Sequence, residues 1–224
     1  LSDSKISGTG NYTGGIAGEA YDMENCHVTG TVTVSGAAYV GGVSGYQDGT
    51  ITQCSNAAVV VATGNHVGGV TGYVQSDAST AMTECFNTGS VTGNSVVGGL
   101  TGDLYNGGTI SACYNTGAVT ATAAAGTAGG LVGIFRSGTI KNTYHSGTIT
   151  AASVGSVAGK LDFPNGQKTL EKVYVLSGSM ETVGSPGDCT IQNGTAVSKT
   201  AEARKALTPA ELGDKFTADT GAVN

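Results

Sequence analysis

Four cysteines at near-regular spacing are the residues of this chain best suited to chemistry. Thiols can form disulfides, bind zinc or pack as small apolar side chains. In later segments a threonine and a valine occupy the equivalent position. The column reads Cys26, Cys54, Cys85, Cys113, Thr143 and Val173.

This column favours packing over chemistry. Thr143 and Val173 have no thiol, so the position is typical of a buried slot for small side chains. No CxxC pair or Cys/His cluster is present to bind a metal. Stacked neighbours would lie about 4.8 Å apart, which a disulfide tolerates, so pairing between neighbouring thiols stays open. The fifth cysteine, Cys189, lies outside the column.

The histidines and carboxylates form no catalytic set. His27, His66 and His145 stand at different positions relative to the cysteines, and we expect them at the surface or in turns. His27 follows Cys26 directly, but adjacent residues of a strand face opposite ways. A glycosidase needs two carboxylates about 5–10 Å apart. The nearest approach to an acidic cluster is expected to be a set of solvated residues: Asp77, Glu84 and Asp103. The sequence therefore predicts no catalytic residue, cofactor or metal.

A six-residue segment recurs through the chain and defines its organisation. The clearest copy is Val-Gly-Gly-Leu-Thr-Gly at residues 97–102, and we call this segment the glycine motif. Successive copies start 27, 27, 30, 31 and 26 residues apart, a period typical of repeat architectures. The copies start at Thr13, Val40, Val67, Val97, Ala128 and Val154.

Alternation within each repeat predicts three short strands, one at the glycine motif, one at the cysteines and one at a later Thr-Val-Thr segment. The third residue after each motif start is apolar and is expected to face a core. The column three residues later is expected to face outward, and it contains Glu19, Tyr46, Tyr73, Asp103, Ile134 and Lys160. In the third strand the inward column is expected to be Val32, Val60, Val91, Val119 and Ile149.

No single repeat has enough apolar side chains for its own core, so the repeats must stack. The predicted fold is an all-β, single-stranded β-solenoid of about five coils over residues 1–179, with a small C-terminal cap over residues 180–224. Residues 162–176 resemble a degenerate last coil, and residues 188–197 resemble extra strands with a turn at Asn193-Gly194. Short helices are predicted at residues 200–207 and 208–212, with Thr200 and Thr208 as N-caps.

Charge excludes some classes of partner. The net charge is −6, and no Lys or Arg occurs between Ile6 and Phe135. An acidic body is unsuited to nucleic acid and to anionic membranes. No apolar run reaches the roughly 18 residues that span a bilayer.

Two pairs of tyrosines are the candidate surface contacts. Tyr46 and Tyr73 are expected to stack on consecutive coils, as are Tyr114 and Tyr144. Exposed aromatic ladders can hold sugars or protein partners. The alternative is that each pair only stabilises its sheet.

The glycine motif with a trailing Cys-[FY]-Asn-Thr-Gly, at residues 85–89 and 113–117, resembles the GLUG motif. The resemblance extends over residues 13–159. GLUG repeats occur in large bacterial surface proteins, including adhesin-like proteins and the non-catalytic part of IgA1-specific metallopeptidases. The resemblance implies secretion, cell-surface display and a role in adhesion or as a spacer. It transfers no functional residues.

We therefore expect a non-enzymatic, extracellular module of a bacterial cell-surface protein, adhesive or stalk-like. Its partner would be a host or microbial surface protein or a glycan. One alternative is a carbohydrate-binding or carbohydrate-active solenoid, and another is a passive segment of a secreted metallopeptidase. The chain begins in mid-repeat, since residues 6–10 resemble the tail of a preceding coil, so we also expect it to be part of a longer protein.

Overall fold

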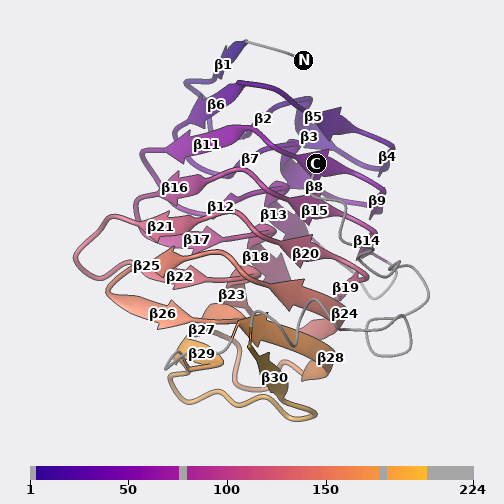
Figure 1. Ribbon diagram of the computed structural model, residues 1–224, viewed down its shortest axis with the longest axis vertical. Helices are drawn as coiled ribbons and strands as arrows, with labels where there is room; N and C mark the ends of the chain where they lie inside the picture. Colours follow the sequence, from indigo (N-terminus) through magenta and orange to yellow (C-terminus); the bar gives the residue numbers. More distant parts are fainter. Residues whose placement is uncertain (1–3, 76–79, 177–180, 201–224) are drawn as a thin grey trace.

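The chain winds into a column of parallel strands, with its coils stacked along the long axis in Figure 1. The structure is a computed structural model that describes residues 4–75, 80–176 and 181–200. Each strand pairs in parallel with the equivalent strands of the neighbouring turns. This confirms the predicted all-β solenoid.

Sheets A and B each have six strands, one for every turn, so the described residues complete six turns, not about five. Sheet A contains β1 (Lys5–Ser7), β6 (Thr33–Gly36), β11 (Val59–Ala62), β16 (Val91–Gly93), β21 (Val119–Ala121) and β25 (Ile149–Thr150). Sheet B contains β2 (Thr13–Gly14), β7 (Val40–Gly41), β12 (Val67–Gly68), β17 (Val96–Gly98), β22 (Thr127–Gly129) and β26 (Ser153–Gly155).

Sheet C contains β3 (Ala17–Ala20), β8 (Ser44–Gln47), β13 (Thr71–Gln75), β18 (Thr101–Tyr105), β23 (Val132–Phe135), β27 (Ala158–Leu161) and β29 (Val183–Ser185). Sheet D begins as two rows. One row is β4 (Met23–Glu24), β9 (Ile51–Thr52), β14 (Ala81–Thr83) and β19 (Thr109–Ser111). The other is β5 (His27–Val28), β10 (Ser55–Asn56), β15 (Phe86–Asn87) and β20 (Tyr114–Asn115). They merge in β24 (Gly138–His145), and β28 (Lys168–Leu176) and β30 (Ala196–Lys199) follow.

The three strands predicted for each repeat are therefore too few. The glycine motif spans two strands, one in sheet B and one in sheet C. The segment around the cysteines is also divided into two strands in the first four turns, at a residue with positive φ that precedes the cysteine column. In the last two turns the strand continues through this residue. That φ lies between 49° and 55° in all six turns. The residues at this bend are Asn25, Gln53, Glu84, Ala112, Asn142 and Lys172.

We expect Ala112→Gly to stabilise the protein by about 1 kcal/mol. Ala112 has a φ of 52°, a left-handed conformation that penalises Cβ and that glycine adopts freely. Ala81→Gly is the matched control, since Ala81 lies in β14 outside the left-handed column, and glycine there should destabilise by roughly 0.5–1 kcal/mol. Chemical unfolding measures both changes. Destabilisation by Ala112→Gly would contradict the expectation.

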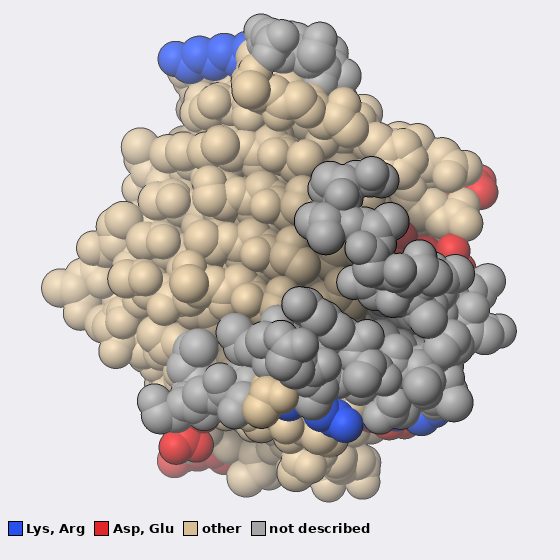
Figure 2. Space-filling model, viewed as in Figure 1, with Lys and Arg blue, Asp and Glu red and all other residues tan. Residues whose placement is uncertain are grey.

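Equivalent side chains stack into one continuous core. Val43, Val70, Leu100 and Leu131, which were expected to face inward, are all fully buried. Ile16, at the same position in the first copy of the motif, is 47% exposed. In sheet A the ladder uses Val34 in place of the expected Val32, because the register pairs Val34 with Val60. Figure 2 shows that the outer face over β6, β11 and β16 is free of charged side chains.

The thiol column forms the packing ladder that the sequence predicted. Cys54, Cys85 and Cys113 are buried, and all the cysteines are free thiols. The amides of Cys54 and Cys85 donate to the sulfur of the next turn at 3.4 and 3.3 Å. Hydrogen bonding between neighbouring thiols and burial raise the pKa of Cys54. A thiol held in its neutral form is a poor nucleophile, so the ladder is structural.

A buried asparagine ladder explains the second glycine of the motif. Asn87 Nδ2 donates to Asn115 Oδ1 at 2.8 Å, and Asn56 bonds to Asn87 in the same way. A Cβ on Gly99 would overlap both the Asn115 side chain and the carbonyl oxygen of Gly130 in the next turn. Glycine is therefore required at position 99, because the Asn115 side chain and the backbone of the next turn both lie against its Cα.

His145 continues the asparagine ladder, so its predicted surface or turn position is wrong. It pairs in register with Asn115, its Nδ1 lies 3.1 Å from Asn115 Nδ2, and it is 1% exposed. The register explains the error, because His145 takes the place of asparagine in this turn. A glycine again makes room, since a Cβ on Gly130 would meet the imidazole ring.

The parallel sheets continue toward the C-terminus. The predicted last coil is confirmed by β28, which pairs with β24 over most of its length. The predicted extra strand overlaps β30, and the expected turn contains Gly194 with a φ of 79°. The described residues end at residue 200, so the helices predicted at residues 200–207 and 208–212 lie outside them from residue 201 onward. None of the described residues forms a helix able to cross a bilayer.

Candidate functional site

A continuous set of ring side chains runs along the outside of the column where sheets B and C adjoin. We call it the aromatic strip. Its rings come from residues that precede strands of sheet B and from strands of sheet C or the turns after them. Neighbouring ring centroids lie 4.9–6.3 Å apart. The strip consists of Tyr12, Tyr39, Tyr46, His66, Tyr73, Tyr105 and Phe163.

The predicted stacking of Tyr46 on Tyr73 is confirmed, with centroids 5.5 Å apart and planes 10° from parallel. The sequence did not indicate the second row of the strip. Tyr39 stacks on His66 at 4.9 Å and meets Tyr73 edge-on at 5.6 Å. The signal was available, because Tyr12, Tyr39 and His66 all directly precede the glycine motif.

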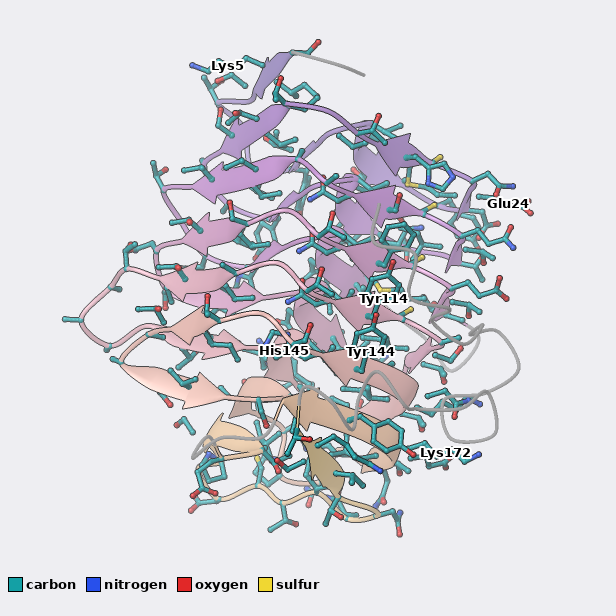
Figure 3. The ribbon with its side chains drawn as sticks, in the orientation of Figure 1. Lys5, Glu24, Tyr114, Tyr144, His145 and Lys172 are labelled. Carbon is teal, nitrogen blue, oxygen red and sulfur yellow. The ribbon has the colours of Figure 1, made fainter. Side chains whose placement is uncertain are left out.

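The other predicted pair, Tyr114 and Tyr144, lies on a different sheet. These rings stack at 5.0 Å on sheet D, and Phe86 extends the ladder at 4.8 Å. Figure 3 shows Tyr114 and Tyr144 one above the other on neighbouring coils. The planes of neighbouring rings are within 2° of parallel, so the rings stack face to face. This geometry favours stabilisation of the sheet.

The last glycine of the motif brings the two rows of the strip together. A Cβ on Gly102 would overlap the backbone of His66 and Val67, so sheet C approaches the start of the sheet B strands without side chains between. Tyr39 and His66 also have positive φ values of 49° and 59°. Among the described residues that precede strands of sheet B, these two alone have this conformation, which is costly for bulky side chains. The strain supports a specific role for these rings.

Asp103 is a buried carboxylate that contacts His66 of the strip. We expected a solvated carboxylate in the outward column, but Asp103 is fully buried. Both of its oxygens accept from Arg136 Nε at 3.0 Å, and Arg136 Nη2 adds a contact of 3.0 Å. His66 Nε2 lies 3.4 Å away. The prediction failed because side chains from neighbouring turns cover Asp103. Ile134 in the same outward column is also covered, with 5% exposure.

Arg136 links the ion pair to the far end of the strip. Its guanidinium lies over the rings of Tyr105 and Phe163, 5.6 and 5.1 Å from their centroids. Its Nη1 donates to Asp162 at 2.6 Å. Two carboxylates and two aromatic rings therefore surround one cation, an arrangement that combines charge pairing with cation–π attraction.

A buried lysine fixes the turn that presents Phe163. Lys168 Nζ donates to the carbonyl oxygens of Phe163 and Gly166, both at 2.8 Å. Burial lowers the pKa of Lys168, and Cys189 and Asp162 act in the opposite direction. Since Nζ bonds to the backbone, Lys168 is a support for the strip and is not exposed to a ligand.

Two phenols of the strip, those of Tyr46 and Tyr73, are held neutral. Burial, followed by the negative charge of Asp103, raises the pKa of Tyr73 above its usual value. Burial also raises the pKa of Tyr46, and Asp48 and Glu19 add to the shift. These tyrosines can offer ring faces and hydroxyl hydrogen bonds, but they are poor proton acceptors at neutral pH.

The acids and histidines considered for catalysis do not gather at one site, apart from the contact of His66 with Asp103. Glu84 lies at the left-handed bend of sheet D, where it accepts from Gln53 at 2.9 Å, while Asp103 lies in sheet C. Asp77 lies outside the described residues. His27 Nδ1 contacts Ser55 Oγ at 2.8 Å. Among the described residues, no group of three or more His, Cys, Asp or Glu side chains could hold a metal ion.

These features define a parallel β-solenoid repeat protein whose distinctive surface is an elongated strip. The family model for the GLUG motif matches residues 9–33, which contain the first glycine motif and Cys26. The chain therefore carries the GLUG motif, and the later copies in register support a GLUG-repeat family. The comparisons with curated proteins and with solved structures found no match.

Proposed function

We propose that this chain is a non-enzymatic repeat module of a secreted bacterial surface protein, acting in adhesion or as a stalk that presents a binding surface. The observation that carries the proposal is the aromatic strip. Its rings follow the column from Tyr12 to Phe163, and these two end residues are 44% and 38% exposed. Aromatic side chains that remain accessible on a rigid support are typical of recognition surfaces.

The geometry of the charged groups supports binding over catalysis. A nucleophile must lie within hydrogen-bond reach of its base. Among the described residues, His66 makes its polar side-chain contact with the carboxylate of Asp103. That carboxylate also forms an ion pair with Arg136. The buried pair therefore orients the surface and has no exposed reactive group.

The extracellular location is part of the same proposal. It is supported by the GLUG motif and by the uncharged outer face over β6, β11 and β16. Antibodies raised against the chain should label intact cells of the organism that encodes it. Labelling only after the cells are permeabilised would contradict surface display.

A carbohydrate ligand is a second candidate, because accessible tyrosine rings can stack on sugars. Tyr12 is the ring that favours it, since it is the most exposed of the strip. The role of passive segment in a secreted metallopeptidase has no observation of its own in the structure. The sequence on both sides of these repeats in the full protein would test that role directly.

We expect the immobilised chain to bind at least one member of a panel of glycans, mucins and extracellular matrix proteins. Tyr46→Leu combined with Tyr73→Leu should weaken that binding by about tenfold, because stacked rings contribute roughly 0.5–1.5 kcal/mol each beyond their buried area. The control is Tyr114→Leu combined with Tyr144→Leu, the same change on sheet D. Equal losses in both variants, or no binding to any member, would refute the proposal.

A further inference from the structure

The two ends of the aromatic strip have the same kinds of groups, but only one end holds a cation. At the C-terminal end, Arg136 lies over Tyr105 and Phe163 and pairs with Asp103 and Asp162. This is an internal example of how a guanidinium binds to the strip. It combines two rings with two carboxylates.

The N-terminal end has rings and carboxylates in a similar combination. Tyr12 contacts both Tyr39 and Tyr46, at 5.3 and 5.1 Å. Glu19 is the strand neighbour of Tyr46 in sheet C, and Glu19 and Asp48 both act on the pKa of Tyr46. Their combined charge is −2, from two Asp/Glu side chains that are both exposed.

No cation of the described chain fills this end. Between Ile6 and Phe135 the sequence has no Lys or Arg. Among the described residues, the cations over rings are Arg136 and Lys199, and neither lies on Tyr12, Tyr39 or Tyr46. The ion pairs of the described residues likewise leave out Glu19 and Asp48. The two exposed carboxylates and the exposed ring of Tyr12 are thus available to a partner.

We infer that the N-terminal end of the strip binds a basic protein segment and takes an arginine side chain as its anchor. The inference rests on the proposed function and names the partner of the same surface. A guanidinium fits better than an ammonium, because its plane can stack on tyrosine while its N–H groups reach carboxylates. The position that Arg136 occupies at the other end supplies the geometry.

The test uses the full chain and two labelled probes, an arginine homopeptide and a lysine homopeptide of equal length. Binding is measured by fluorescence anisotropy at physiological ionic strength. We expect the arginine peptide to bind several-fold tighter, because a diffuse negative field would not distinguish the two cations. Equal affinities would overturn the inference.

Variants locate the contact. Tyr12→Leu with Tyr46→Leu, and separately Glu19→Gln with Asp48→Asn, should each weaken the arginine peptide by about fivefold or more. The charge-matched control is Glu24→Gln with Glu171→Gln, two exposed acids of sheet D, one of which Figure 3 shows at the edge of the column. Thermal melts confirm that each variant is folded. Equal losses in the control would show a field effect and overturn the inference.

The outcomes separate this inference from the proposed function. If the chain binds a neutral glycan through Tyr46 and Tyr73 but neither peptide, the binding module stands and the basic partner is wrong. If it binds neither the panel nor the peptides, both proposals fail. Selective loss of arginine-peptide binding in the ring and acid variants supports both.

Discussion

Gly99→Ala is expected to lower the free energy of unfolding by at least about 3 kcal/mol, a large effect for a single methyl group. The new Cβ would overlap the carbonyl oxygen of Gly130 and the side chain of Asn115. The carbonyl belongs to the backbone of the next turn, so relief requires two coils to move apart. Chemical unfolding followed by circular dichroism measures the change.

Gly10→Ala is the matched control. A Cβ on Gly10 has no neighbour within 4 Å, so the effect should stay within about 0.5 kcal/mol. A second variant, Gly99→Ala with Asn115→Ala, removes the side-chain overlap but keeps the clash with the backbone, so it should remain strongly destabilised. If Gly99→Ala unfolds at the same midpoint as Gly10→Ala, close packing of the coils is not the reason for the motif.

The last turn shows what the second glycine is for. Ser156 takes its position there, and Val175 takes the position of the ladder asparagine. The amide of Ser156 bonds to the carbonyl of Glu181, outside any further copy of the motif. A side chain is therefore tolerated where the asparagine and the next motif are both absent. The second glycine of the motif and the ladder asparagine therefore depend on each other, because the glycine leaves the space that the asparagine side chain fills.

Periodicity was sufficient to predict the column, because a solenoid places residues of equal register above one another. The ladder of Cys54, Cys85 and Cys113 and the buried Leu100 and Leu131 follow from comparing the chain with itself. The number of strands in each turn was harder to predict. The division of the cysteine segment falls at a left-handed residue that can be Asn25, Gln53 or Ala112, so no single residue type marks the bend.

The candidate site was predictable only where it repeats. Tyr46 and Tyr73 share a column, so their stacking follows from the register. Asp103 and Arg136 each occur once, and their contact joins different positions of neighbouring turns. Alternation along the strand correctly predicted that Asp103 faces away from the core, but it could not predict that the side chain is buried. An outward side chain can still be covered, and the cover here comes from His66 and Arg136.

Arg136→Met should destabilise the protein by roughly 3–5 kcal/mol, because it leaves the buried carboxylate of Asp103 without its cation. The methionine retains most of the apolar volume, so loss of the charge dominates. Chemical unfolding again provides the measurement. Lys141→Met is the control, because Lys141 lies in the outward column of sheet D and forms no ion pair with the described residues.

The paired variant Asp103→Ile with Arg136→Met decides between two explanations. The next residue of the same column is Ile134, so an isoleucine side chain suits this position. If the buried charge causes the loss, removing both charges should recover most of it, since hydrophobic replacements of buried ion pairs are often neutral or stabilising. If the loss came from the contacts of Arg136 with Tyr105 and Phe163, the paired variant would remain as unstable as Arg136→Met. Recovery would show that Arg136 compensates a charge which the coil alone cannot bury.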